Sequence, residues 1–140
     1  MTRRTFLAAP AAALAAASAR LPIKKAVLLN MLPKSISMLD RFKLAVDCGF
    51  EQIECPTIED PGQAEEIKRA AEGSGLRIHS VMNMAHWKYP LSSADASVVA
   101  TSIRGLETSL RNAHFWGADT VSLRCDRSSK SSVLLISFVQ

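Results

Sequence analysis

The stretch Gly49-Phe50-Glu51-Gln52-Ile53-Glu54-Cys55-Pro56 decides the fold, because it joins a helix end, a short apolar strand and a polar strand end. Glycine is common just beyond the last turn of a helix, and residues 50–55 have the composition of a strand. The same kind of junction returns at Gly75-Leu76-Arg77-Ile78 and at Gly117-Ala118-Asp119-Thr120-Val121. The repeated junction predicts a chain that alternates helices with strands.

Each junction follows a segment with the signals of a helix. Ser37 and Asp40 resemble a capping box, and Asp60-Pro61 places an N-cap before a proline at the first helical position. A third helix is expected from Ala94 to Trp116. Its expected apolar stripe, spaced by four and three residues, consists of Val99, Ile103, Leu106, Leu110 and Ala113.

The strands are expected at residues 23–29, 50–55, 76–82 and 119–123. Strands that alternate with helices pair in parallel through right-handed crossovers, so the fold class is α/β. A complete (β/α)8 TIM barrel takes about 250 residues, so this chain has room for a partial barrel of about four strands and three helices. A small open sheet is the alternative. In either case we expect both edge strands to be unpaired.

The first nineteen residues carry the signals of an export peptide. Arg3-Arg4 is followed by Thr5 and the apolar residues 6–16, and Ala17-Ser18-Ala19 matches the small-residue pattern of a cleavage site. The apolar stretch is short for a bilayer core of about 30 Å. We therefore expect residues 1–19 to be a twin-arginine signal and the mature protein to be periplasmic or secreted. An ordinary alanine-rich helix is the alternative.

The net charge of +4 does not point to a nucleic-acid or membrane partner. Five of the 17 basic residues and one of the 13 acidic residues lie outside residues 20–123, which leaves twelve of each sign within that segment. A balanced segment has no basic surface to attract a polyanion. We therefore expect no nucleic acid, and no membrane association once the signal is cleaved.

The cysteines are expected to remain unbridged. Cys48 ends a helix and Cys55 ends the following strand, so the two should lie at opposite ends of the sheet. Six or seven strand residues span roughly 20 Å, whereas bridged α-carbons lie within about 7 Å. The third cysteine, Cys125, falls in the tail.

The sequence around two strands resembles the xylose isomerase-like TIM-barrel superfamily, which contains sugar phosphate isomerases and epimerases. The motifs are residues 49–56 and Ile78-His79-Ser80-Val81-Met82. The loop Ala85-His86-Trp87-Lys88-Tyr89-Pro90-Leu91-Ser92-Ser93 is similar to the loop after strand three of hexulose-6-phosphate epimerases. The resemblance covers residues 23 to about 123, and it implies metal-dependent isomerisation or epimerisation of a sugar or sugar phosphate.

The resemblance ends near residue 124. We divide the chain into the signal (1–19), the N-terminal half of a TIM barrel (20–124) and a divergent tail (125–140), in which the apolar run Val133–Val139 has the composition of a strand. The family's divalent metal is held by residues of the second half of the barrel. The resemblance therefore implies no metal ligand and no catalytic residue here, and we expect the coding sequence to be truncated or frame-shifted near residue 124.

Three residues are predicted to bind substrate. The reactive groups of parallel barrels lie at the carboxyl ends of the strands, where Glu54 is expected. Glu54 is predicted to bind a sugar hydroxyl or support a metal ligand; alternatively, it pairs with a neighbouring strand. The resemblance implies that His86 hydrogen-bonds the sugar and that Trp87 stacks on it, on a loop over the pocket mouth. A solvated loop is the alternative.

A zinc site made by Glu54, His79 and His86 has the right residue types but no diagnostic spacing. A satisfied core histidine is the simpler interpretation of His79. Three functional hypotheses follow: a truncated sugar isomerase, a non-catalytic carbohydrate-binding half-barrel, or a non-functional fragment. The expected partner is a small sugar, and a homodimer would cover the open sheet edges.

Overall fold

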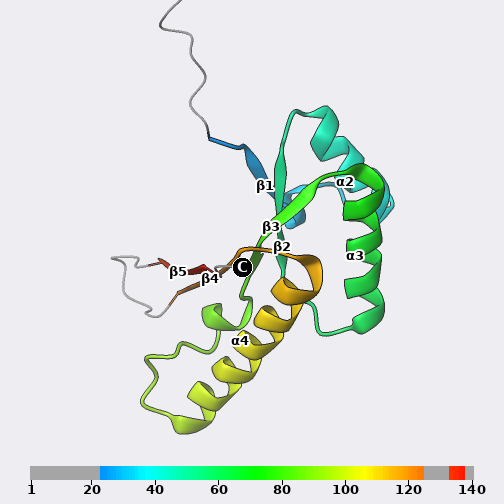
Figure 1. Cartoon of the computed structure of the whole chain (residues 1–140). Coiled ribbons are helices and arrows are strands. Elements are labelled where there is room, and N and C mark those ends of the chain that lie inside the picture. Colours follow the sequence, from blue (N-terminus) through cyan, green and yellow to red (C-terminus); the bar gives the residue numbers. More distant parts are fainter. Residues whose placement is uncertain (1–22, 125–132, 138–140) are drawn as a thin grey trace, which may run out of the picture.

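The computed structural model of this chain describes residues 23–124 and 133–137. Four parallel strands alternate with three helices, which confirms the predicted partial barrel (Figure 1). The strands are β1 (Ala26–Leu28), β2 (Gln52–Pro56), β3 (Arg77–Met82) and β4 (Thr120–Arg124). The helices are α2 (Met38–Asp47), α3 (Pro61–Ser74) and α4 (Ala96–Trp116), with the short 3-10 turns η1 (Leu29–Met31) and η2 (Ala85–Trp87).

The sheet has a fifth strand, which covers one of the two edges that we expected to be unpaired. The strand order is β1-β2-β3-β4-β5, and β5 (Val133–Ser137) pairs with β4 in the antiparallel direction. The expectation that both edges would be unpaired was therefore wrong for β4. Part of the tail thus extends the sheet, whereas the rest of it and the predicted signal at 1–19 lie outside the described residues.

The helix ends follow the capping signals of the sequence. The Ser37 hydroxyl accepts a hydrogen bond from the Asp40 amide at 3.1 Å, and the Asp60 carboxylate accepts one from the Gly62 amide at 3.0 Å. Such bonds satisfy amide groups that the first helical turn leaves without partners. Gly75 and Gly117 end α3 and α4 with positive φ angles of 73° and 68°, which other residues rarely adopt.

Helix α4 begins later than predicted, and it buries part of the predicted stripe together with polar residues beside it. Its N-cap is Asp95, whose carboxylate accepts a hydrogen bond from the Ser97 amide at 2.8 Å. Hydrogen bonds from Ser97 lower the pKa of Asp95. Ile103 of the predicted stripe is 45% exposed. Ala113 of that stripe is buried, and Leu106 and Leu110 pack against the core. The other buried positions of α4 are Ser102, Ser109 and Asn112.

The core lies between the sheet and the helices. Phe42 of α2 and Ile67 of α3 are completely buried, and they belong to the same cluster as Val81 and Val121 of the sheet. Burial of such side chains contributes about 1.5–3 kcal/mol each. Near the start of α3, the carbonyl of Ala64 accepts a hydrogen bond from the indole nitrogen of Trp116 at 2.9 Å, which connects α4 to α3.

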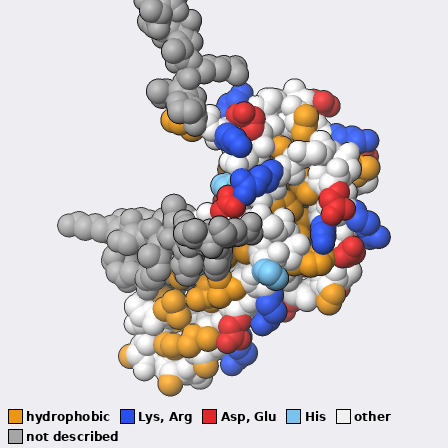
Figure 2. Space-filling model, viewed as in Figure 1, with side chains coloured by type: hydrophobic (Ala, Val, Ile, Leu, Met, Phe, Trp, Pro, Cys, Tyr) orange, Lys and Arg blue, Asp and Glu red, His pale blue; other side chains and the backbone are white. Residues whose placement is uncertain are grey.

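Surface composition differs between the two halves of the molecule. Hydrophobic side chains gather over the α4 half of the face in Figure 2, whereas acidic and basic side chains alternate over the α2 and α3 half. Within the described residues, no helix has the length and apolar character to cross a bilayer.

Cys48 is exposed and Cys55 is buried, and both are free thiols. Burial raises the pKa of the Cys55 thiol.

Candidate functional site

Glu54 lies near the carboxyl end of β2, on the sheet face opposite the helices. Its neighbours Ile53 and Cys55 point into the core, and side chains alternate along a strand. One carboxylate oxygen, Oε1, accepts hydrogen bonds from the hydroxyls of Ser80 at 2.9 Å and Ser122 at 2.7 Å. The three side chains therefore form a polar platform, made from β2, β3 and β4, on the inner face of the partial barrel.

A register irregularity in β3 brings Ser80 to this platform. Ile53 pairs with Ile78, but the next residue, Glu54, pairs with Ser80, so His79 is the extra residue of a bulge. Bulges re-aim the side chains that follow them. Without this extra residue, the alternation of β3 would put His79 beside Glu54 in place of Ser80.

His79 is half-buried at this bulge rather than a fully enclosed core residue. Its carbonyl accepts a hydrogen bond from the Asp119 amide at 3.1 Å. Burial lowers the pKa of His79, and Arg77 acts in the same direction, whereas the charges of Glu54 and Asp119 oppose the shift. Arg77 and Asp119 themselves form an ion pair next to it.

The lowered pKa of His79 predicts a pH-dependent stability. Below about pH 6.5, the usual pKa of histidine, the unfolded chain binds a proton that folded His79 binds less readily. The stability contributed by neutral His79 is therefore present above that pH and declines as the pH falls. We expect the drop in Tm between pH 7.5 and 5.5 to be smaller in His79→Gln than in the wild type. His114→Gln is the control at an exposed histidine, and an equal drop in all three proteins would contradict the prediction.

The segment after β3 holds the two other predicted site residues. His86 and Trp87 belong to the 3-10 turn η2, not to an open loop, and their ring centroids are 4.8 Å apart. His86 is only 6% exposed, whereas Trp87 is 53% exposed. Trp87 therefore has an accessible side chain, and the largely buried ring of His86 packs against it.

Backbone and side-chain hydrogen bonds connect η2 to the Glu54 platform. The carbonyl of Ser122 accepts a hydrogen bond from the Asn83 amide at 2.9 Å, while the hydroxyl of the same serine donates to Glu54. The buried Asn83 side chain in turn accepts from the Ala85 amide at 2.8 Å, at the start of η2. Ser122 thus joins the platform to the turn that holds His86 and Trp87.

Thr57, just beyond β2, holds the same region against α4. Its hydroxyl lies 2.9 Å from the Met82 carbonyl, 2.7 Å from the Ser109 hydroxyl and 3.3 Å from the Met84 amide. One turn further along α4, the side chain of Asn112 accepts a hydrogen bond from the Ile58 amide at 2.8 Å. These bonds explain why polar residues occupy buried positions of α4 beside the predicted apolar stripe.

The described residues do not form a metal site. No group of three or more histidine, cysteine, aspartate or glutamate side chains in residues 23–124 and 133–137 is arranged to hold a metal ion. The structure therefore does not bring together Glu54, His79 and His86 as zinc ligands. Oε1 of Glu54 is engaged by two serine hydroxyls, whereas Oε2 makes no hydrogen bond within the described residues.

Comparisons with known proteins identify the fold. No protein-family model and no curated protein matches the sequence. Among solved structures, 3-keto-D-glucoside 4-epimerase YcjR from E. coli is similar with a TM-score of 0.61 and 16% identity, over 76% of this chain and 38% of that chain. D-allulose 3-epimerase from Methylomonas sp., in complex with D-allulose, has a TM-score of 0.56 and 19% identity, over 71% of this chain and 35% of that one.

A third similar structure is an AP endonuclease, family 2, from Brucella melitensis, with a TM-score of 0.53 and 16% identity, over 79% of this chain and 44% of that one. This chain spans less than half the length of each of the three. Identities this low show the fold alone. The chain has the fold of part of a TIM barrel.

Proposed function

We propose that this chain is the sugar-binding part of a sugar isomerase or epimerase, and that it binds its ligand at the carboxyl ends of β2, β3 and β4. The observation that carries the proposal is the Glu54 carboxylate, oriented on the inner face by Ser80 and Ser122 from two neighbouring strands. The likeness of the fold to two sugar epimerases supports it.

Each predicted residue has a distinct role in the proposal. Oε2 of Glu54 accepts a hydrogen bond from a sugar hydroxyl. The exposed ring of Trp87 packs on the apolar face of the sugar, and His86, packed against that ring, keeps it in place. Both ring nitrogens of His86 are buried, so the direct hydrogen bond to the sugar that we also predict would need η2 to shift.

The proposed reaction moves a proton beside a sugar carbonyl, which requires a positioned base. The resemblance implies a divalent metal for the full-length enzyme. Since the described residues do not fit a metal, we assign them substrate binding and orientation only. The proposed ligand is a sugar or a sugar phosphate.

Replacement of Glu54 tests the proposed site. We expect Glu54→Gln to weaken binding of D-allulose by about tenfold in isothermal titration calorimetry, because a neutral amide is a weaker acceptor for a sugar hydroxyl. Glu72→Gln, at an exposed position of α3, is the matched control and should bind like the wild type. Equal affinities of both variants, with unchanged melting curves, would refute the role of Glu54.

A second candidate function is a non-catalytic carbohydrate-binding half-barrel. The observation that favours it is the antiparallel strand β5, because a barrel would continue from β4 with a parallel strand. This candidate predicts sugar binding without turnover, and a melting temperature that rises with protein concentration if a homodimer forms. Metal-dependent epimerisation of D-allulose by the purified chain would exclude it.

Export is a separate proposal that rests on the residues before the barrel. The twin arginines Arg3 and Arg4 precede an apolar run and a cleavage pattern. We expect cell fractionation to find the protein in the periplasm or medium, and Arg3→Lys/Arg4→Lys to retain it in the cytoplasm. Unchanged fractionation of the double variant would contradict a twin-arginine signal.

A further inference from the structure

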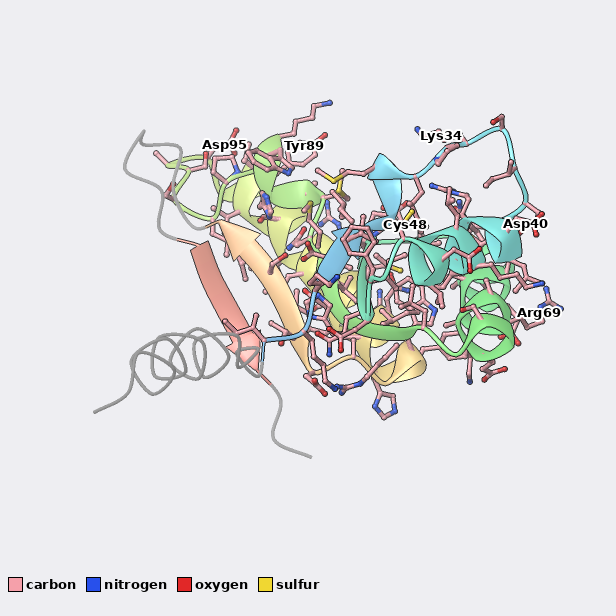
Figure 3. The ribbon with its side chains drawn as sticks, turned by 90° about the horizontal axis from the view of Figure 1, so that it is seen from above. Lys34, Asp40, Cys48, Arg69, Tyr89 and Asp95 are labelled. Carbon is pink, nitrogen blue, oxygen red and sulfur yellow. The ribbon has the colours of Figure 1, made fainter. Side chains whose placement is uncertain are left out.

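A groove lies outside the Glu54 platform, between the segment after β2, the η2 region and α4. Its volume is about 610 Å³, and its polar and aromatic lining includes Thr57, Glu59, Tyr89, Arg104, Glu107 and Arg111. Thr57 and Tyr89 follow β2 and β3, so the groove opens at the carboxyl end of the sheet. Figure 3 shows Tyr89 near Asp95, at the start of α4.

Two arginines of α4 are held in equivalent positions in this groove. The repeat Thr101-Ser102-Ile103-Arg104 and Thr108-Ser109-Leu110-Arg111 places them seven residues apart, about 10 Å along one helix face. In each copy the guanidinium Nη2 donates to the threonine hydroxyl at 2.9 Å. Arg77–Asp119 is the single ion pair of the described residues, so neither arginine is neutralised by a carboxylate within 4.0 Å.

The lining indicates a neutral ligand with many hydroxyl groups. Glu59 and Glu107 balance the two arginines in formal charge, so the groove has no net field to attract a polyanion or a cation. Guanidinium groups only donate and carboxylates only accept, while a sugar hydroxyl does both. Tyr89 adds an amphipathic ring of the kind that packs on a sugar face. A volume of this size lies within the range of about 300–1,000 Å³ that is usual for small-molecule sites.

We propose that this groove is a saccharide subsite, which binds the second sugar unit of an uncharged disaccharide or glycoside whose first unit occupies the Glu54 platform. Met84 and Ala85 line the groove, and His86 and Trp87 follow them directly in the chain, so the η2 region contributes residues to both proposed sites. The inference rests on the proposed function, and it deepens that function by naming the substrate as larger than a monosaccharide.

Calorimetry on the full chain tests the subsite with D-allulose, maltose and cellobiose as probes. We expect at least one disaccharide to bind about tenfold more tightly than D-allulose. The double variant Arg104→Gln/Arg111→Gln should lose this gain while keeping the affinity for D-allulose. Arg69→Gln is the matched control, since Arg69 is exposed on α3 and lies away from Tyr89 in Figure 3. Melting curves establish that each variant is folded.

The outcomes separate this inference from the proposed function. D-allulose binding without any gain for the disaccharides, or a gain that survives in the double arginine variant, overturns the subsite and leaves the Glu54 site standing. Disaccharide binding that depends on the arginines but not on Glu54 supports the groove and overturns the proposed site. Displacement of the disaccharide by inorganic phosphate would make the groove an anion site and overturn the saccharide class.

Discussion

We expect Gly105→Ala to lower the free energy of unfolding by about 1–3 kcal/mol, although alanine favours a helix over glycine by about 1 kcal/mol. A Cβ atom at Gly105 would lie 2.4 Å from the Cβ of Ala85. Because two non-bonded carbon atoms do not approach so closely, the substitution must push α4 and η2 apart. Urea denaturation measures the loss, and the displaced η2 should also weaken D-allulose binding.

Gly62→Ala is the control for the helix preference alone. A Cβ atom there would meet only the Asp60 carboxylate, at 3.5 Å and 3.9 Å, which is ordinary contact. This variant should be as stable as the wild type or slightly more stable. A Gly105→Ala protein that matches it in stability would show that η2 does not pack against α4 as described.

Thr57→Val should destabilise the chain by about 1–3 kcal/mol, the usual effect of leaving buried polar groups without their hydrogen bonds. Valine keeps the shape of threonine but removes the hydroxyl that meets the Met82 carbonyl, the Ser109 hydroxyl and the Met84 amide. The segment from Met82 to Met84 leads into η2, so the loss should also reduce sugar binding.

Thr101→Val separates this effect from the general cost of losing a threonine hydroxyl. Thr101 is a partly exposed α4 residue whose hydroxyl bonds only within its own helix. We expect its effect on the urea midpoint to be small. Equal shifts for the two valine variants would show that the Thr57 network contributes nothing particular to the fold.

Local signals explain why most of the fold was predictable. The N-caps Ser37 and Asp60 and the left-handed glycines Gly75 and Gly117 act within one turn of the chain, so a sequence pattern is enough to locate them. Alternating helices and strands then determine parallel pairing. The partial barrel with four parallel strands followed from these features.

Long-range contacts account for the features that the sequence did not reveal. Ser109 and Asn112 are buried because they bond to Thr57 and to the Ile58 amide, more than fifty residues earlier in the chain. Gly105 is explained only by the approach of Ala85. The antiparallel direction of β5 is likewise a tertiary property, because an apolar run has the same composition in either direction.

The candidate site was predictable in position but not in detail. The carboxyl end of β2 pointed to Glu54, yet Ser80 and Ser122 became its partners through the bulge at His79, which no local pattern marks. The resemblance to hexulose-6-phosphate epimerases predicted His86 and Trp87 as site residues. It did not indicate that Asn83 would connect their turn to β4.

The most direct test of the proposed sugar site is a titration of the isotope-labelled chain with D-allulose, followed by amide chemical shifts. We expect the largest shifts at Glu54, Ser80 and Ser122 and in η2, and we expect Glu54→Gln to reduce them at equal ligand concentration. Shifts that are absent at saturating sugar, or that centre on α2 and α3, would contradict sugar binding at Glu54.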